Sequence, residues 1–271
     1  MLKQRVITAV ILAPLAIAGF VLLQGAWFAF FIGAVVAVGA WEWARLCGET
    51  RQSGRVVYAL TLGLFMVGLY RDQWPVIYYL IPALVWWLFA ALMVVRYPAG
   101  SGIWKGSFLR QVFGLLILLP AWAGLVWLRA QAEGLWLIFA LLILVWAADI
   151  GAYFAGKQFG RTKLMPNVSP GKTREGLLGG LLVSELLAFA TMLYLGWGPV
   201  AMLLGALGAA LVVLFSVVGD LTESLFKREE GLKDSSNLLP GHGGVLDRID
   251  SLTAAIPVFV ACWLLIGSYL E

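Results

Sequence analysis

Charged residues are scarce in this 271-residue chain: 13% of its residues are Asp, Glu, Lys or Arg, whereas 62% are hydrophobic. Soluble domains are about one quarter charged and about half apolar. So few polar side chains cannot cover a water-facing surface, whereas lipid solvates apolar side chains directly. The composition therefore excludes a water-soluble globular protein and predicts a membrane protein.

Cysteine and histidine are also scarce. The two cysteines, Cys47 and Cys262, lie far apart and beside or within apolar runs, so the sequence offers neither a disulfide framework nor a thiolate metal site. We expect both to be packing residues. The net charge of +4 is compatible with nucleic acid binding, but the basic residues are sorted by loop, which indicates membrane orientation and no nucleic-acid partner.

Nine apolar runs are present, and a helix needs roughly 20 mostly apolar residues to cross a bilayer. They cover approximately 6–23, 26–46, 56–70, 76–95, 111–128, 135–154, 177–196, 200–219 and 251–270. The sequence thus predicts an all-α, polytopic integral membrane protein with about nine transmembrane helices. Because we find no fixed-period repeat or linker, we treat 1–271 as one membrane-embedded domain.

The first run has a cleaved signal peptide as its alternative, because Lys3 and Arg5 precede an apolar stretch and small residues at 16–18. The apolar run continues through Phe20 to Leu23, past the cleavage point. This continuation favours an uncleaved first span.

Basic residues fall on one side when the loops are assigned alternately to two faces. Of the 19 Lys and Arg residues, only Arg71 and Arg129 lie on the other side. Since basic loops prefer the cytoplasm, the amino terminus is predicted inside. An odd number of spans then places Glu271 outside.

The first of two long inside loops, 155–176, is rich in basic residues. Cytoplasmic loops are commonly basic, but the segment SPGKT at 169–173 also combines a proline-fixed turn, a flexible glycine, hydroxyls and a lysine. These groups wrap phosphate oxygens. A P-loop is excluded, because Pro166 stands where that motif requires glycine and a membrane span replaces the preceding strand.

The second long inside loop, 221–250, is too polar to cross the membrane. Its first stretch is expected to continue the eighth helix, placing Asp220, Glu223 and Lys227 on one face, with Gly231 stopping the helix. Further along, PGHGG at 240–244 cannot be a regular helix, and its glycines allow the backbone to approach a ligand closely.

Three carboxylates, Asp149, Asp220 and Asp247, are predicted to converge at the cytoplasmic mouth. Hard oxygen ligands select magnesium, which usually binds one or two carboxylates and the phosphates of a substrate. A nucleotide-type substrate fits this prediction. Asp250, in the first turn of the ninth span, is equally well explained as a helix cap. His242 could be a metal ligand or proton carrier, and we favour phosphate contact.

Two further carboxylates, Glu42 and Glu185, lie within apolar runs, where an ionised group is costly and usually paired or facing a cavity. Glu42 is close enough to Arg45 for a plain interfacial pair, which we expect. Glu185 either lines a substrate cleft or is protonated and hydrogen-bonded inside the bundle.

The segment SLFKREEGLKDSSNLLPGHGGVLDRID, 224–250, closely resembles the signature of the phosphatidate cytidylyltransferase family, also called CDP-diacylglycerol synthases. DIGAYFAGKQFG at 149–160 and SPGKTREG at 169–176 resemble the upstream motifs of that family. The signature is matched with unbroken spacing at Ser224, Lys227, Arg228, Lys233, Asp234, Pro240, His242, Gly243, Gly244, Asp247, Arg248 and Asp250.

The resemblance implies that CTP and phosphatidic acid react at the cytoplasmic face of the bacterial inner membrane. The products would be CDP-diacylglycerol, for phospholipid biosynthesis, and pyrophosphate. Magnesium is the implied metal, with room for a second cation, and the resemblance suggests a homodimer. Because a phosphate monoester is substantially ionised near neutral pH, no strong general base is needed.

The resemblance and the loop chemistry together give a set of candidate site residues. The catalytic candidates are Asp220, Asp247, Lys227 and Arg248. The substrate-binding candidates are Lys157, Ser169, Lys172, Thr173, Arg174, Arg228, Lys233, Asp234, His242, Gly243 and Gly244. The metal candidates are Asp220, Asp247, Asp149 and Asp250.

The nearest alternative of another class is a transporter for an anionic metabolite. Transporters commonly show internal repeats and broken helices near the midplane, whereas the polar groups here cluster at one face. A non-catalytic scaffold would leave the carboxylates and glycines without a purpose. Both alternatives predict no turnover of CTP.

The distribution of basic residues predicts sidedness. A cysteine placed in 161–168 should react only from the cytoplasmic side, whereas tags at 271 and in 129–134 should lie outside. Labelling with a membrane-impermeant thiol reagent in intact cells measures this. Reaction of the 161–168 position in intact cells would overturn the orientation.

Overall fold

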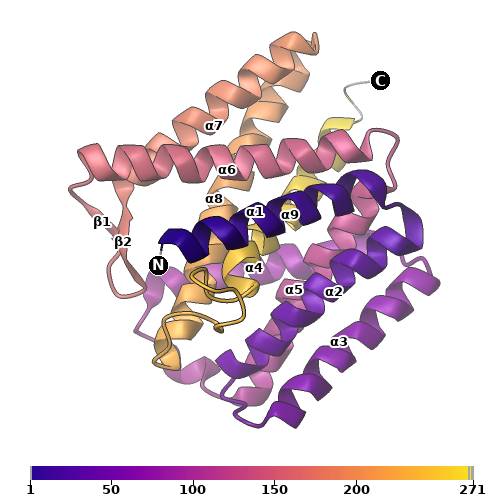
Figure 1. Cartoon of the computed structure of the whole chain (residues 1–271). Coiled ribbons are helices and arrows are strands. Elements are labelled where there is room, and N and C mark those ends of the chain that lie inside the picture. Colours follow the sequence, from indigo (N-terminus) through magenta and orange to yellow (C-terminus); the bar gives the residue numbers. More distant parts are fainter. Residues whose placement is uncertain (1, 268, 270–271) are drawn as a thin grey trace.

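The computed structural model describes residues 2–267 and 269, without the side chains of 2–7 and 9. Helices dominate the described chain, which confirms the predicted all-α fold (Figure 1). In chain order the elements are α1 Leu2–Leu22, α2 Gly25–Leu46, α3 Gln52–Arg71, α4 Ile77–Arg96, the 3₁₀ helix η1 Ser101–Trp104, α5 Ser107–Arg129, α6 Gly134–Phe159, β1 Lys163–Met165, β2 Ser169–Thr173, α7 Arg174–Tyr194, α8 Pro199–Glu229 and α9 Leu246–Gly267.

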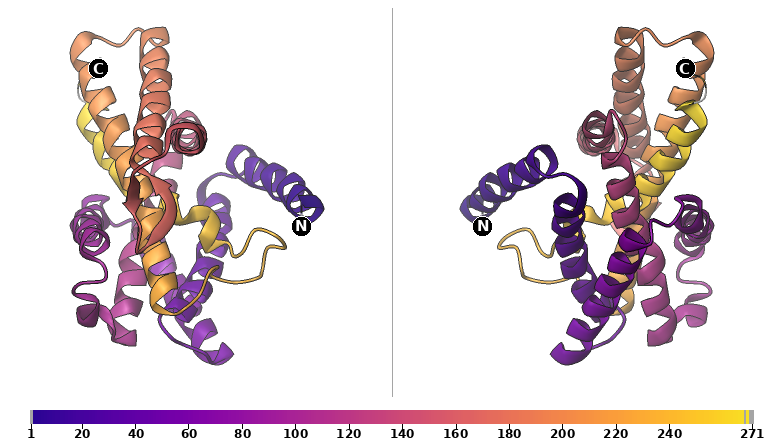
Figure 2. Two further views of the ribbon diagram at one scale, coloured as in Figure 1. Left: turned by 90° about the vertical axis from the view of Figure 1, so that its left-hand side faces the viewer. Right: turned by 90° about the vertical axis from the view of Figure 1, so that its right-hand side faces the viewer.

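Eight helices, α2 to α9, are long and apolar enough to cross a membrane. The third span, which is the shortest apolar run in the sequence, is a full helix of 20 residues. Helix α1 has a shorter apolar stretch, Val10–Leu22, and leans away from the other helices (Figure 2). Eight of the nine predicted spans are therefore confirmed as membrane-length helices, and a spanning α1 stays a prediction.

Helix α8 continues beyond the predicted span into the second inside loop, as the sequence predicted, and ends at Glu229. Gly231 follows with a positive φ of 65°, which glycine adopts without a steric penalty. The buried Arg110 guanidinium of α5 pairs with Glu229 at 3.4 Å and with Glu230. This ion pairing fixes where α8 stops.

Indole groups join α2 to α5 in the core. The Trp43 N–H donates to the Arg110 carbonyl at 2.8 Å, and the Trp122 N–H donates to the Ala29 carbonyl at 2.9 Å. The Trp43 ring also meets the Phe226 ring of α8 edge-on, with centroids 5.0 Å apart. These contacts fix both ends of α2 within the bundle.

Small residues let α6 and α7 pack closely. A side chain added at Gly179 would overlap Ala155, and one added at Gly180 would overlap the Ala148 carbonyl. The hairpin β1–β2 connects the end of α6 to the start of α7, so the close packing of these helices positions the hairpin relative to the bundle.

Both cysteines are free and pack against neighbouring residues, as predicted. Cys47 is buried directly after α2, and Cys262 is half-buried in α9. Burial raises the pKa of the Cys47 thiol above its ordinary value, which disfavours the reactive thiolate.

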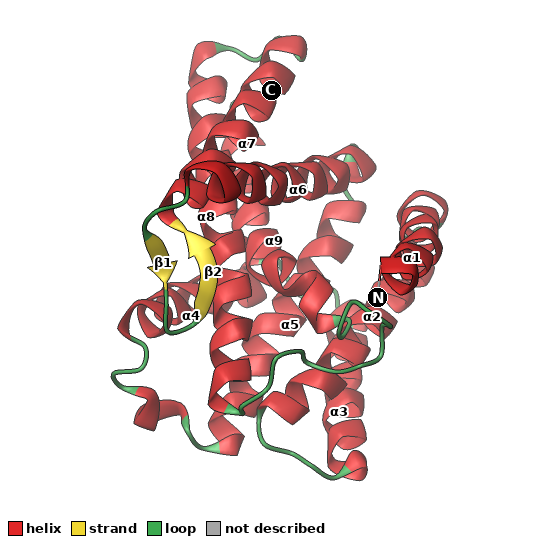
Figure 3. Cartoon of the chain, turned by 60° about the vertical axis from the view of Figure 1, so that its left-hand side comes forward, coloured by secondary structure: helices red, strands yellow, loops and turns green. Residues whose placement is uncertain are grey.

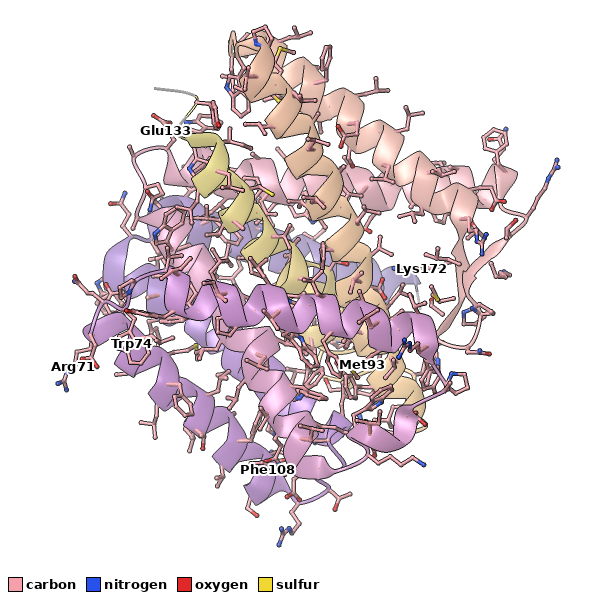
Figure 4. All side chains as sticks on the ribbon, turned by 180° about the vertical axis from the view of Figure 1, so that it is seen from behind. Arg71, Trp74, Met93, Phe108, Glu133 and Lys172 are labelled. Atoms are coloured by element: carbon pink, nitrogen blue, oxygen red, sulfur yellow. The ribbon has the colours of Figure 1, made fainter. Side chains whose placement is uncertain are left out.

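The two sets of loops lie on opposite flanks. Arg71, Trp74 and Glu133, from the loops predicted outside, lie on one flank, and Lys172 lies on the other (Figure 4). In the view of Figure 1, α1 begins on the same flank as the hairpin, and α9 ends on the opposite flank. The helix directions therefore agree with the alternating assignment, although Glu271 lies outside the described residues.

Candidate active site

The first inside loop folds into an antiparallel hairpin that the sequence analysis missed. Lys163 pairs with Thr173, and Met165 pairs with Ser169. Strands of three and five residues, the second containing proline and glycine, are too short to show a period-two pattern. Thr173 ends β2 and caps α7, because its side-chain oxygen accepts the Gly176 N–H at 3.1 Å.

Two contacts attach the hairpin to α8. The Arg228 guanidinium donates to the carbonyl of buried Val168 at 3.2 Å. On β2, the Lys172 ammonium pairs with the Asp220 carboxylate at 2.7 Å. Arg228 thus holds the hairpin tip, and its predicted role in substrate binding stays a prediction.

A cavity of about 380 Å³ lies between the hairpin, α6, α7 and α8. Its polar lining comprises five predicted site residues: Asp149, Lys157, Lys172, Thr173 and Asp220. Its apolar lining includes Leu164, Leu177, Val213 and Val217. The structure therefore brings the predicted anion-binding segment and two of the predicted carboxylates to one cavity with an apolar wall.

A second polar cluster lies beside this cavity, between α8 and α9. The Lys227 ammonium contacts the Glu223 and Asp247 carboxylates, both at 2.7 Å. The other Asp247 oxygen accepts the Ser235 N–H at 3.0 Å, the Ser235 hydroxyl at 2.8 Å and the Gly244 N–H at 2.7 Å. Both oxygens of Asp247 are therefore engaged by protein donors.

The two lysines differ in exposure. The side chains of Lys227, Glu223 and Asp247 are 10%, 3% and 5% exposed, whereas those of Lys172 and Asp220 are 27% and 30% exposed. Burying an ion costs several kcal/mol unless partners compensate. Lys227 therefore neutralises buried charge, whereas Lys172 can release Asp220 to water or to a ligand at lower cost.

The remaining predicted residues are not among the lining residues of the cavity in the described structure. Asp250 accepts the N–H of its neighbour Ser251 at 2.7 Å. The remaining predicted substrate-binding and catalytic residues outside the lining are Ser169, Arg174, Lys233, Asp234, His242, Gly243, Gly244 and Arg248. Their roles toward substrate stay predictions.

The expected pair of Glu42 with Arg45 is wrong. Glu42 instead accepts hydrogen bonds from Ser236, Val245 and Leu246, and Arg45 donates to the Ser235 carbonyl at 3.1 Å. Sequence spacing favoured the local partner, because the distant loop that supplies these donors is brought to α2 only by the tertiary fold. Glu185 is absent from the cavity lining, and one of its oxygens is buried without a partner among the described residues.

A magnesium ion was predicted at the carboxylates. Within the described ranges, no three Asp, Glu, His or Cys side chains form a ready-made metal cage. Asp149 and Asp220 nevertheless line the same cavity. Because magnesium commonly takes one or two carboxylates and completes its shell with water and phosphate, this donor pair fits the metal.

Comparisons with known proteins give a consistent result. The model of the cytidylyltransferase family matches residues 3–266. A phosphatidate cytidylyltransferase of Pseudomonas aeruginosa is 60% identical over 261 residues, covering 96% of both chains. That of Haemophilus influenzae is 42% identical over 280 residues, covering 96% of this chain and 97% of the relative. One from Staphylococcus aureus is 40% identical over 154 residues, 56% of this chain and 58% of the relative.

The difference in burial between the two lysines predicts different stabilities. Lys227→Met leaves Glu223 and Asp247 buried without their cation, which should cost about 3–5 kcal/mol. Lys172→Met removes a partly exposed pair and should cost about 0–1 kcal/mol. Thermal midpoints in detergent at one scan rate measure both. Equal midpoints for the two variants would contradict the structural role of Lys227.

Proposed function

The chain belongs to the cytidylyltransferase family, and we propose on that basis that it transfers the cytidylyl group of CTP to phosphatidic acid. The products are CDP-diacylglycerol and pyrophosphate. The observation that carries the proposal is the cavity, where Lys172 and Thr173 of the hairpin face Asp149 and Asp220 beside an apolar wall. A water-soluble triphosphate and the headgroup of a membrane lipid can both reach such a cavity.

The reaction joins two anions. A phosphate oxygen of phosphatidic acid attacks the α-phosphorus of CTP, a new P–O bond forms, and the bond to the β-phosphate breaks to release pyrophosphate. The acid is already ionised near neutral pH, so the main task of the protein is to reduce charge repulsion and align the reactants.

Residues that line the cavity suit this task. Lys157 and Lys172 supply positive charge, and α7 begins at the lining of the cavity, so that the positive end of its helix dipole also favours an anion there. When substrate binds, the Lys172 ammonium would leave the Asp220 carboxylate and pair with a phosphate. That exchange would release the Asp220 carboxylate inside the same cavity.

We also propose magnesium, held by Asp220 and assisted by Asp149. When bound, the metal would draw charge from the phosphate oxygens and stabilise the pyrophosphate leaving group. Asp247 was the other principal predicted ligand, and its oxygens already accept four protein donors. We therefore propose that Asp247 holds the loop 235–244 in place and does not bind the metal. Asp250 as a ligand and a second cation stay predictions.

We propose that the cavity faces the cytoplasm of a bacterial cell and that the amino terminus lies inside. This orientation is supported by the basic loop 155–176, whose Lys172 lies on the flank opposite Arg71 (Figure 4), because basic loops prefer the cytoplasmic side. A carboxyl terminus outside and a homodimer remain predictions.

The activity itself can be tested with purified protein in detergent. Pyrophosphate should be released only when CTP, phosphatidic acid and a divalent cation are all present, and ATP or GTP should substitute poorly. Coupled detection of pyrophosphate, with the lipid product checked by mass spectrometry, measures this. Equal release with ATP, or release without the lipid, would remove the assignment.

The metal assignment predicts a specific loss in Asp220→Asn. This change keeps the side-chain shape but removes the charge that a divalent cation requires, so turnover should fall by a factor on the order of 100. The thermal midpoint should change little, because Asp220 is partly exposed. The measurement is a magnesium titration of turnover together with the midpoint.

Two variants serve as comparisons for Asp220→Asn. Asp72→Asn, on the opposite flank beside Arg71, should match the wild type. Asp247→Asn should lower the midpoint, because it weakens a buried network. Near-normal turnover of Asp220→Asn at low magnesium would exclude it as the ligand, and a shifted magnesium dependence of Asp247→Asn with an unchanged midpoint would reassign the metal to Asp247.

A further inference from the structure

The glycine-rich loop, defined here as residues 235–245, joins α8 to α9 and reaches out toward α1 (Figure 3). Some of its hydrogen bonds lie within the loop: Leu239 N–H donates to the Gly243 carbonyl at 2.8 Å, His242 N–H donates to the Leu239 carbonyl at 2.9 Å, and Leu238 N–H donates to the Ser236 hydroxyl at 3.0 Å. Gly241 and Gly243 have positive φ angles of 78° and 82°. Glycine loses much conformational entropy on folding, so this loop needs external contacts to keep one conformation.

Glu42 supplies such contacts from a distant part of the sequence. It lies on α2 and is fully buried. Its carboxylate accepts the Ser236 hydroxyl at 2.5 Å, the Val245 N–H at 3.0 Å and the Leu246 N–H at 2.6 Å. Ser235 also approaches at 3.4 Å, but its single hydroxyl hydrogen has a nearer acceptor in Asp247 at 2.8 Å.

These donors explain why a carboxylate is present in an apolar run. Leu246 begins α9, and the first N–H groups of a helix have no partner within it. An ionised carboxylate offers about four acceptor positions, whereas the glutamine amide offers one acceptor oxygen and two donor hydrogens. The buried charge is therefore compensated by three good donors, two from the backbone and one from Ser236.

Glu42 and Asp247 bind adjacent residues at both ends of the loop. Asp247 binds Ser235 and Gly244, whereas Glu42 binds their neighbours Ser236 and Val245. A side chain at Gly244 would overlap both Ser235 and Glu42, so the backbone passes directly between them. The ends of the loop are therefore fixed between two carboxylates, one on α2 and one on α9.

The contacts of Glu42 and Asp247 with the loop extend to α8 through Lys227. The Asp247 oxygen that does not contact the loop pairs with Lys227 of α8 at 2.7 Å. The same helix carries Asp220, which lines the cavity. Displacement of the loop from Glu42 would disturb the Ser235 and Gly244 donors of Asp247 and, with them, the position of Lys227.

We propose that Glu42 is a positioning residue for the cytidylyl transfer, which fixes the glycine-rich loop and thereby the Asp247 and Lys227 side chains beside the cavity. This inference rests on the proposed function. Glu42 touches neither the cavity nor the reacting groups, and it acts through the loop that it holds.

The test compares the wild type with Glu42→Gln. Hydrogen–deuterium exchange of peptides covering 235–246 should rise about tenfold, the factor expected from one lost buried hydrogen bond. Exchange in the hairpin, 163–173, should not change. In the pyrophosphate assay kcat should fall about tenfold or more. Wild-type exchange together with wild-type kcat would overturn the proposal.

The matched control is Trp122→Phe, which removes a buried hydrogen bond to Ala29 at the other end of α2. It should lower the thermal midpoint but leave exchange in 235–246 and kcat unchanged. Faster exchange in Glu42→Gln with an unchanged kcat would assign Glu42 a purely structural role and overturn the positioning role.

A second variant covers the case in which Glu42→Gln does not fold. Ser236→Ala removes one donor to Glu42 and should raise exchange and lower kcat in the same direction. If Glu42→Gln does fold, the effects of the two substitutions should be non-additive in the double variant, because both act on one contact. A wild type that releases no pyrophosphate would refute the proposed function, whereas the exchange experiment would still decide whether Glu42 holds the loop.

Discussion

The contact of Lys227 with Glu223 and Asp247 is the interaction on which the arrangement of α8, α9 and the loop between them depends. All three side chains are largely buried, and a buried ion is tolerated only with close partners. Lys227 supplies the charge, and Ser235 and Gly244 supply the remaining donors to Asp247. Through this contact α8, α9 and the loop between them keep one relative position.

The polar groups at this end of the protein form two sets with different roles. The buried set, Glu42, Lys227 and Asp247, is satisfied by protein donors and acceptors and holds the backbone. The partly exposed set, including Lys172 and Asp220, lines the cavity and can exchange its partners for a ligand. Preorganised charge next to a reacting phosphate is effective because it need not reorganise during the reaction.

The membrane setting explains how the two substrates meet. The outer faces of the helices carry exposed large apolar side chains such as Leu64, Phe108 and Trp136, which suits contact with lipid. Lys172 and Thr173 of the hairpin line the cavity together with Asp149 and Asp220. A cavity with a polar mouth and walls from Val213 and Val217 therefore lies where a lipid phosphate and a soluble nucleotide can both arrive.

The sequence alone determined the helical membrane fold, the sorting of basic loops and the family signature, because apolar runs and short motifs are local patterns. It also predicted that Asp149, Asp220 and Asp247 converge, because all three lie near the ends of predicted spans, and Asp149 and Asp220 line one cavity. Only the tertiary structure decided the hairpin, the engagement of Asp247 by Ser235 and Gly244, and the partners of Glu42. The hairpin strands are too short to show a periodic pattern, and the partners of Glu42 lie 194 to 204 residues away in the sequence. The choice between competing partners for a buried carboxylate depends on packing that no local pattern records.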